Sequence, residues 1–419
     1  MSLHRTGVCF ALSALLILTA CTRTEPPAPV APSAMAKSFY GTAWELHPDA
    51  RALTTLGREL FSSKALSSSG QLACVSCHAP DHAYGPPNNL AVQLGGADLK
   101  MSGVRAVPSL MYAQDTPPFS EHFNDTDGDD SIDQGPTGGR DWDGRASSAH
   151  KQASGPLLSA FEMCHSDSAA VVAQLKTSSS ADAMRATFGA HVFDDPAKAW
   201  KGLLLALEVF QQSPEDFYPY SSKYDAVLRG KAQLTANEQR GLAVFNDANK
   251  GNCLQCHPGT IKRGAFPQFT DRGFIAIGVP RNRAIPANAD PHYFDLGVCG
   301  PLREDLRDHP EYCGLFKTPT LRNVATRSVF FHNGAMRSLD EVVRFYSERD
   351  VHPEKFYPRD TARHVMKFDD LPAPYRVNLN DEAPFDRKPG NAPVMSATEM
   401  KDLVAFLKTL SDGYAGATP

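Results

Sequence analysis

Two pentapeptides constrain this chain more than any other feature of its sequence. Residues 74–78 read CVSCH and residues 253–257 read CLQCH, and each has the C-x-x-C-H pattern of covalent c-type haem attachment. In this pattern two thiols bond to one porphyrin and the adjacent imidazole binds its iron. Chance would give about 0.006 such motifs in a chain of this composition. The motifs therefore predict two covalently bound haem c groups, with four attachment cysteines and two iron-ligating histidines: Cys74, Cys77, Cys253, Cys256, His78 and His257.

Two other interpretations of the paired motifs stay open. A zinc site would require the two motifs to converge or to recruit further histidine ligands, and a redox dithiol would not require the histidine. Haem attachment also agrees with the character of the N-terminus, because c-type haem is attached outside the cytoplasm.

Residues 1–20 are typical of an export signal. Residues 8–18 form an apolar run of about eleven residues, which is too short to span a bilayer. The run ends in Leu18-Thr19-Ala20-Cys21, which resembles a bacterial lipobox and predicts acylation of Cys21; an ordinary signal peptide is the alternative. Residues 21–45 are rich in Pro and Ala and predict a tether. We therefore expect a periplasmic protein that meets the membrane only through an N-terminal lipid anchor.

The segments that precede the two motifs form an internal repeat. Each contains a Gly-x-x-apolar-Phe stretch, at residues 57–61 and 241–245, and the first cysteines of the motifs lie 253 − 74 = 179 residues apart. This repeat predicts two tandem c-type cytochrome domains, over residues 46–230 and 231–413, followed by a tail at 414–419. We expect the haems to face the domain interface.

Helix signals outnumber strand signals along the whole chain. Capping boxes at Thr235 and Ser396 predict two helix starts, and 30 Gly with 32 Pro indicate long loops. The 42% apolar and 21% charged residues exclude a disordered or fibrous protein. A net charge of 42 − 47 = −5 without a basic stripe argues against nucleic acid as a partner. The expected fold class is mainly α with long loops.

Two cysteines outside the haem motifs bracket a short charged loop. Cys299 and Cys313 enclose this loop, and an oxidising compartment favours a disulfide between them over two free thiols. Cys164 has no obvious partner in the sequence.

Further motifs lie between and after the two haem motifs. Residues 142–146 read WDGRA, and residues 316–324 and 331–334 read FKTPTLRNV and FHNG; between them stand Gln152-Ala153, Gly155-Pro156 and Glu162-Met163. With these motifs the chain resembles the bacterial di-haem cytochrome c peroxidase superfamily, which includes the MauG-type enzymes. The resemblance runs from Leu46 to Leu410. It implies that hydrogen peroxide reacts in the first domain and that a small redox protein is the electron donor or the substrate.

The resemblance assigns three residues to catalysis. It implies that Trp142 lies between the haems, that Glu162 is the acid/base over the first haem, and that Gln152 lies beside Glu162. A carboxylate in this place can move the proton that accompanies cleavage of the peroxide O–O bond. Without the resemblance, Trp142 would be interpreted as a core residue and Glu162 as a cap or as a partner of Arg145.

The sixth coordination position of the first haem iron decides whether peroxide binds without a rearrangement. Many members of the superfamily carry a second histidine on the loop before the WDGRA box, whereas residues 100–108 (KMSGVRAVP) contain none. His82 follows His78 closely, and His122 lies in an acidic insertion. We therefore expect a five-coordinate iron in the oxidised protein, with His122 as the one residue able to fold back.

The second haem requires an axial ligand opposite His257. The resemblance places it fourteen residues after the FHNG histidine, at 332 + 14 = 346, where ordinary peroxidases have Met and MauG-type proteins have Tyr. This chain has Tyr346, which shares one helix face with Leu339, Val342 and Val343. A phenolate stabilises ferric iron, whereas a thioether raises the reduction potential. The alternatives are Met336, Met366 and Met395, with Tyr346 as a core residue.

Calcium is a further expectation of the resemblance. Members of the superfamily hold a calcium ion between the haems with one Asn side chain, backbone carbonyls and waters. Here Ala106 matches that Asn and residues 327–329 (RSV) stand where TAP is usual, which puts the site in doubt. The acidic stretch at residues 125–133 predicts either a calcium loop or a solvated loop.

These features together predict an exported di-haem c-type oxidoreductase of the cytochrome c peroxidase type. It would react with hydrogen peroxide at the first haem and exchange electrons through the second. A MauG-like, peroxide-dependent oxidation of a protein or organic substrate is the alternative, and Tyr346 favours it. A non-enzymatic electron carrier is a third interpretation, which Glu162 and Gln152 disfavour.

Overall fold

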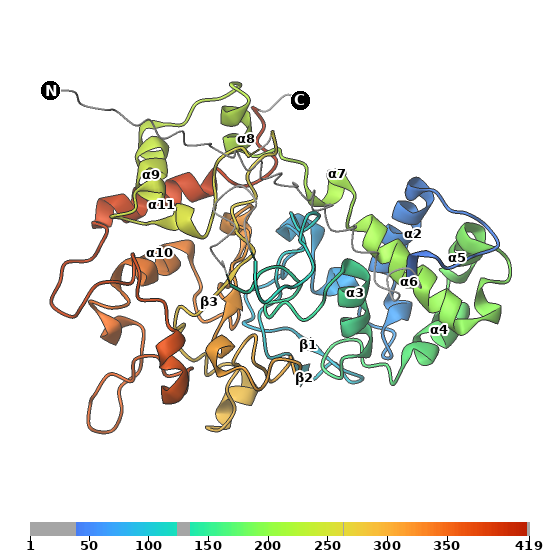
Figure 1. The fold of residues 1–419 in the computed structure, drawn as a ribbon. Helices are drawn as coiled ribbons and strands as arrows, with labels where there is room; N and C mark the ends of the chain where they lie inside the picture. The colour runs from blue at the N-terminus through green and yellow to red at the C-terminus, as the bar shows by residue number, and fades with distance from the viewer. Residues whose placement is uncertain (1–38, 124–134, 263, 417–419) are drawn as a thin grey trace, which may run out of the picture. The chain divides into compact units, whose positions relative to one another are not determined.

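Helices provide most of the regular structure of the chain (Figure 1), which confirms the mainly α class. The computed structural model describes residues 39–123, 135–262 and 264–416, and the chain from Trp44 onward forms one compact unit. The predicted signal peptide, Cys21, most of the tether and the acidic stretch 125–133 lie outside the described residues. The α-helices of the described residues are α2 (Ala50–Ser62), α3 (Ala149–Leu158), α4 (Ser168–Lys176), α5 (Ala181–Phe188), α6 (Pro196–Phe210), α7 (Pro214–Phe217), α8 (Lys223–Leu228), α9 (Ala236–Asn246), α10 (Leu339–Glu348) and α11 (Ala397–Lys408).

Helices α2 and α6 pack against each other (Figure 1), and α2 also contacts the first haem motif. Gly57 makes this contact possible, because a Cβ atom there would lie 2.1 Å from the carbonyl oxygen of Ala206. The rings of Phe61 and Phe210 meet edge to face, with centroids 5.5 Å apart. Helices α3 and α4 also contact α6, so α6 is the central helix of this half.

Helices α9 and α11 repeat this arrangement near the second haem motif (Figure 1). A Cβ atom at Gly241 would lie 2.0 Å from the carbonyl oxygen of Asp402, so glycine is again what permits the helices to touch. The rings of Phe245 and Phe406 meet edge to face at 5.3 Å. Helix α10 packs on α11 and carries Tyr346.

Both predicted capping boxes are present. Glu238 Oε2 accepts a hydrogen bond from the Thr235 backbone N–H at 2.7 Å, at the start of α9. Glu399 Oε2 accepts from the Ser396 N–H at 2.7 Å, at the start of α11. These reciprocal bonds satisfy N–H groups that the first turn of a helix leaves without partners.

Strands are few and short in the described residues. Strand β1 (Leu94–Gly95) pairs antiparallel with β2 (Met101–Ser102), with Leu94 opposite Ser102. Strand β3 (Phe274–Ile275) pairs antiparallel with β4 (Phe316–Lys317), with Phe274 opposite Lys317. Long loops connect these elements, as the glycine and proline content predicts.

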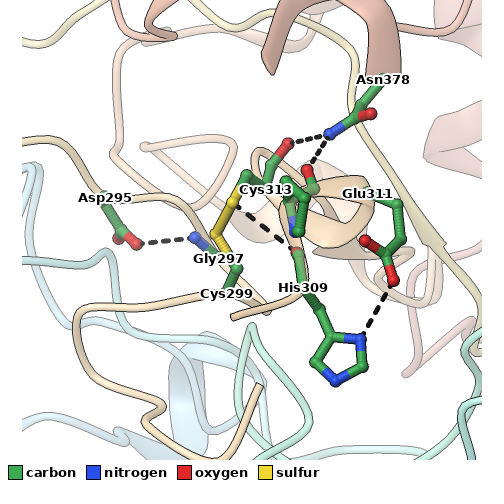
Figure 2. The surroundings of a disulfide bond; sticks show 8 residues. Asp295, Gly297, Cys299, His309, Glu311, Cys313 and Asn378 are labelled. Atoms are coloured by element: carbon green, nitrogen blue, oxygen red, sulfur yellow. Dashed lines mark hydrogen bonds and ion pairs between the residues drawn. A yellow bond between two sulfur atoms is a disulfide. The ribbon is translucent and has the colours of Figure 1, made fainter. Parts of the chain in front are cut away.

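The predicted disulfide between Cys299 and Cys313 is present, and Figure 2 shows its surroundings. Asn378 Nδ2 donates to the carbonyl of Cys313 at 3.0 Å, and the Gly297 N–H donates to Asp295 Oδ1 at 3.1 Å. Gly297 and Asp295 lie just before the loop that the disulfide closes, and the role of Asp295 in the site is described below.

The division into two domains stays a prediction. The chain from Trp44 onward is one compact unit, and the packing of α2 with α6 and of α9 with α11 does not test the proposed boundary at residue 230 within it. No helix in the described ranges combines the length and the apolar character that a bilayer crossing requires.

Candidate active site

A cavity of about 160 Å³ opens beside the first haem motif, and we call it the first cavity. Cys74, Cys77 and His78 line it together with all three residues predicted for catalysis: Trp142, Gln152 and Glu162. The structure therefore brings together residues that lie up to 88 positions apart in the sequence (162 − 74 = 88).

His78 is oriented by the backbone. Its Nδ1 donates to the carbonyl oxygen of Tyr84 at 2.9 Å, which leaves Nε2 as the nitrogen available to a metal. Burial lowers the pKa of His78 to about 4, so the imidazole is neutral at pH 7. A neutral imidazole with a fixed tautomer is the form that binds iron.

Glu162 lies in the turn that follows α3. Its carbonyl accepts from the Gly96 N–H at 2.8 Å, which fixes this turn against the end of β1. Burial raises the pKa of the Glu162 carboxyl, the charge of Asp141 raises it further, and the charge of Arg145 opposes the rise. A carboxyl group with a raised pKa in a cavity is suited to accept and return a proton near neutral pH.

Gln152 lies on α3 and also lines the first cavity. Its Nε2 donates a hydrogen bond to Asp141 Oδ1 at 3.3 Å, and its amide oxygen takes no part in that bond. Arg145 pairs with Asp141 at 3.4 Å and with Asp143 at 3.0 Å, so neither carboxylate is an isolated charge. Arg145 forms no ion pair with Glu162 among the described residues, in contrast to the alternative interpretation of Glu162.

A larger cavity of about 310 Å³ lies beside the second haem motif, and we call it the second cavity. Cys253, Cys256 and His257 line it, and so does Tyr346 on α10. His257 Nδ1 donates to the carbonyl oxygen of Phe269 at 2.8 Å, and burial lowers its pKa. The histidine of the second motif is therefore held in the same way as that of the first.

The structure narrows the candidates for the second axial ligand. Tyr346 and Met395 both line the second cavity, whereas Met336 and Met366 do not; the Met366 residue is 44% exposed. Burial raises the pKa of Tyr346, so its phenolate form requires a nearby cation such as ferric iron. Tyr346 and Met395 therefore remain as candidates for the axial ligand opposite His257.

Trp142 belongs to a wall that the two cavities share. Five residues line both: Pro108, Leu110, Asp141, Trp142 and Gln152. The indole Nε1 donates to the carbonyl of Ala106 at 2.8 Å, and the Trp142 carbonyl accepts from the Lys317 N–H at 2.9 Å. The indole is therefore fixed in the wall that the two cavities share, and its place between two haems stays a prediction.

An ion-pair network that the sequence did not predict includes Asp143, the residue that follows Trp142. Arg105 Nη1 donates to Asp143 Oδ2 at 2.6 Å, and Arg105 Nε donates to Asp295 Oδ2 at 2.6 Å. Arg303, inside the disulfide loop, donates to the Asp143 carbonyl at 2.8 Å. The side chains of Arg105, Asp143 and Asp295 are 7% exposed or less, so the network is buried, and it connects the residue after Trp142 to the disulfide loop.

Histidines are scarce near the first cavity. His78 is the one histidine among the described residues that line it, whereas His82 lines the second cavity and His122 is exposed. This arrangement agrees with the expectation of a five-coordinate iron, which stays a prediction.

The residues of both cavities fit a covalently attached haem. Each cavity combines two free thiols, an imidazole with a fixed Nδ1 and an apolar lining, which is the donor set of c-type attachment. Within the described ranges no group of three or more His, Cys, Asp or Glu side chains is placed to hold a metal. The zinc interpretation therefore gains no support.

Comparison with known proteins points in the same direction. Residues 51–233 match the model of the di-haem cytochrome c peroxidase family. Methylamine utilization protein MauG of Paracoccus denitrificans (strain Pd 1222) is 32% identical, over 91% of this chain and 94% of that protein. Cytochrome c peroxidase Ccp of Escherichia coli K12 is 26% identical, over 75% of this chain and 56% of that protein.

A solved structure extends the likeness to the fold. The crystal structure of the diheme peroxidase BthA from Burkholderia thailandensis E264 is 37% identical, with a TM-score of 0.76 over 87% of each chain. Sequence motifs, cavity linings and these comparisons agree with one another. The chain therefore belongs to the di-haem cytochrome c peroxidase family.

Proposed function

We propose that this enzyme reduces hydrogen peroxide in the first cavity and exchanges electrons through the second. The two C-x-x-C-H motifs and the di-haem family support one haem c for each cavity. One observation carries the proposal: Glu162 and Gln152 line the same cavity as Cys74, Cys77 and His78. An electron carrier has no need of a proton-transferring carboxyl group in that place.

Glu162 would move the proton in this reaction. When it is ionised it would accept the proton from one peroxide oxygen, and it would then donate this proton to the other oxygen, which leaves as water when the O–O bond breaks. Burial raises the pKa of Glu162, so the group binds a proton more readily than an ordinary glutamate, and both steps require it to bind and release the same proton. Gln152 would orient the peroxide with its amide.

The haem groups, when bound, would supply the iron that binds peroxide and would pass on the electrons that reduce it. Reduction of one peroxide to two waters consumes two electrons and two protons, and the electrons come from a reduced partner protein. Trp142 lies in the wall that both cavities share, so its indole shortens each electron step between them.

A MauG-like oxidation of a protein or organic substrate is the second candidate, and Tyr346 favours it. The phenol lines the second cavity beside His257. A phenolate ligand lowers the reduction potential, which makes the second site a weak acceptor for electrons from a high-potential donor. It would store an oxidising equivalent more readily than it would accept such electrons.

One experiment separates the two candidates. Resting holoprotein is mixed with one equivalent of peroxide in a stopped-flow spectrometer, and a reduced small cytochrome is added afterwards. Rapid oxidation of the cytochrome supports the peroxidase. A long-lived doubly oxidised protein with little turnover of the cytochrome supports the MauG-like oxidation, and no spectral response to peroxide contradicts both.

We also propose that the protein works in the periplasm, attached by a lipid at Cys21. The apolar run at residues 8–18 and the LTAC sequence support this location, as does the need to attach c-type haem outside the cytoplasm. Metabolic labelling with a radioactive fatty acid would test it, and loss of the label in Cys21→Ala is the expected result.

A further inference from the structure

Arg327 is a cation that the mechanism above does not use. It lies between the FKTPTLRNV and FHNG motifs and lines the second cavity. Burial lowers the pKa of its guanidinium to about 10, so the group stays charged at pH 7. Among the described residues it forms no ion pair with a carboxylate, which distinguishes it from Arg105.

The guanidinium joins segments that are far apart in the sequence. Its Nη2 donates to the carbonyl oxygen of Val107 at 3.0 Å, and its Nε donates to that of Val329 at 3.2 Å. Val107 lines the first cavity and lies 220 residues before Arg327. Nη1 also lies near the loop after His78, since a Cβ atom at Gly85 would be 3.5 Å from it.

Calcium, which the resemblance implies for this region, does not fit these residues. Ca²⁺ requires six to eight oxygen ligands, and Ala106 has no side-chain oxygen where the superfamily has Asn. The Ala106 carbonyl accepts from the Trp142 indole, and the Val107 and Val329 carbonyls accept from Arg327. A divalent cation beside a fixed guanidinium would also be repelled by it.

We infer that Arg327 is a built-in cation that holds the wall of the first cavity to that of the second, and that this junction works without calcium. The guanidinium offers several N–H donors in a rigid plane, so it can bond the Val107 and Val329 carbonyls at once. Because Nη1 lies near the loop that orients His78, the positive charge of Arg327 also acts electrostatically on His78 and on the haem that it would hold. Arg327 is a positioning residue, because it does not line the first cavity and its hydrogen bonds go to the Val107 and Val329 carbonyls.

The first arm of the test removes calcium from the holoprotein. The protein is treated with EGTA and desalted, and its calcium content, its ferric absorption spectrum and its rate of reaction with peroxide are measured. We expect far less than one calcium per chain, an unchanged spectrum and a rate within about twofold of untreated protein. One calcium per chain that survives the treatment, or a spectrum or rate that changes until calcium is restored, would overturn the inference.

The second arm removes the charge. Arg327→Gln should lower the midpoint potential of the first haem, because a nearby positive charge favours the reduced iron, and should lower the melting temperature of the holoprotein. Arg327→Lys should keep the potential close to that of the wild type, since it keeps the charge, while it loses one of the two hydrogen bonds.

Arg337→Gln is the matched control. Arg337 also bonds across the chain, from its Nη1 to the carbonyl of Asn89, but it is exposed and lines neither cavity. We expect it to leave the potential of the first haem unchanged. Equal potentials of the first haem in Arg327→Gln, Arg337→Gln and the wild type would contradict the inference. If Arg327→Gln fails to fold, the potential of Arg327→Lys and the calcium measurements test the inference instead.

Discussion

The two haem motifs share one scaffold on their proximal sides. In each half a glycine lets two helices touch, and a phenylalanine four residues later meets a second one at almost the same geometry: 5.5 Å and 63° for Phe61 with Phe210, and 5.3 Å and 62° for Phe245 with Phe406. In each half a backbone carbonyl fixes Nδ1 of the histidine. The repeat therefore specifies how a haem is held.

The remaining linings of the two cavities differ. Glu162 lines only the first cavity, Tyr346 and Met395 line only the second, and Gln152 lines both. One side is suited to moving protons and the other to binding iron, although the helices behind them are arranged alike. The chemistry of each cavity is therefore determined by a few side chains and not by the helix packing that the two halves share.

The largest effect should come from the residue that makes the first cavity unlike the second. Glu162→Gln should leave both haems bound and reduce the rate of reaction with peroxide by about 10²- to 10⁴-fold, the usual contribution of a positioned acid/base. Stopped-flow absorbance measures this rate. Glu311→Gln, on the exposed disulfide loop, should react like the wild type, and an equally fast Glu162→Gln would remove the catalytic contrast between the cavities.

The pH profile sharpens the same contrast. Because burial raises the pKa of Glu162, its ionised fraction falls at a higher pH than that of an ordinary glutamate. The rate of reaction with peroxide should therefore decline on the acid side, with its midpoint above the usual carboxyl range. This limb should disappear in Glu162→Gln, and if it persists there another group controls it.

A change of axial ligand in the second cavity should alter the midpoint potential of the second haem. Tyr346→Met should raise the midpoint potential of the second haem by a few hundred millivolts, because axial ligands set haem potentials over about 0.8 V and a thioether favours ferrous iron. Spectroelectrochemistry measures the shift. Met395→Leu is the control, since Met395 lines the same cavity, and a large shift there with none in Tyr346→Met would make Met395 the ligand.

The shared scaffold predicts equal damage in both halves. Gly57→Ala and Gly241→Ala each place a Cβ atom about 2 Å from a backbone oxygen, and each should lower the free energy of unfolding by about 2–3 kcal/mol, as overpacked contacts do. Urea unfolding of the holoprotein measures both. A Cβ atom at Gly155 on α3 meets no atom within 4 Å, so Gly155→Ala should stay within about 1 kcal/mol of the wild type. Unequal effects of the first two variants would show that the halves are not equivalent.

The smallest effect concerns the wall between the cavities. Trp142→Phe should slow electron exchange between the haems by about tenfold, equal to about 1.4 kcal/mol of barrier. Rapid spectroscopy after one equivalent of peroxide follows both haems separately. In Trp44→Phe, which removes an indole that bonds the Lys198 carbonyl and lines neither cavity, the exchange should not change; an equal rate in Trp142→Phe would discard the bridging role.

The parts of the site that the sequence predicts are those whose chemistry is local or repeated. The haem motifs, the capping boxes and the Cys299–Cys313 pair are of this kind, because a few neighbouring residues carry the whole signal. The pairing of Arg105 with Asp143 and Asp295 could not be predicted, since Arg105 lies 38 and 190 residues from these two partners and no periodic pattern links them. Burial and charge become visible only when the loops between the helices have been placed.

The disulfide loop has a practical consequence for work with this enzyme. The Cys299–Cys313 disulfide closes a loop that contains Arg303. Arg303 donates a hydrogen bond to the carbonyl of Asp143, the residue next to Trp142. A thiol reagent such as dithiothreitol, added to prepare the ferrous protein, would reduce the Cys299–Cys313 disulfide at the same time as it reduces the haem iron. Reagents that deliver electrons without attacking sulfur–sulfur bonds would keep the two events apart.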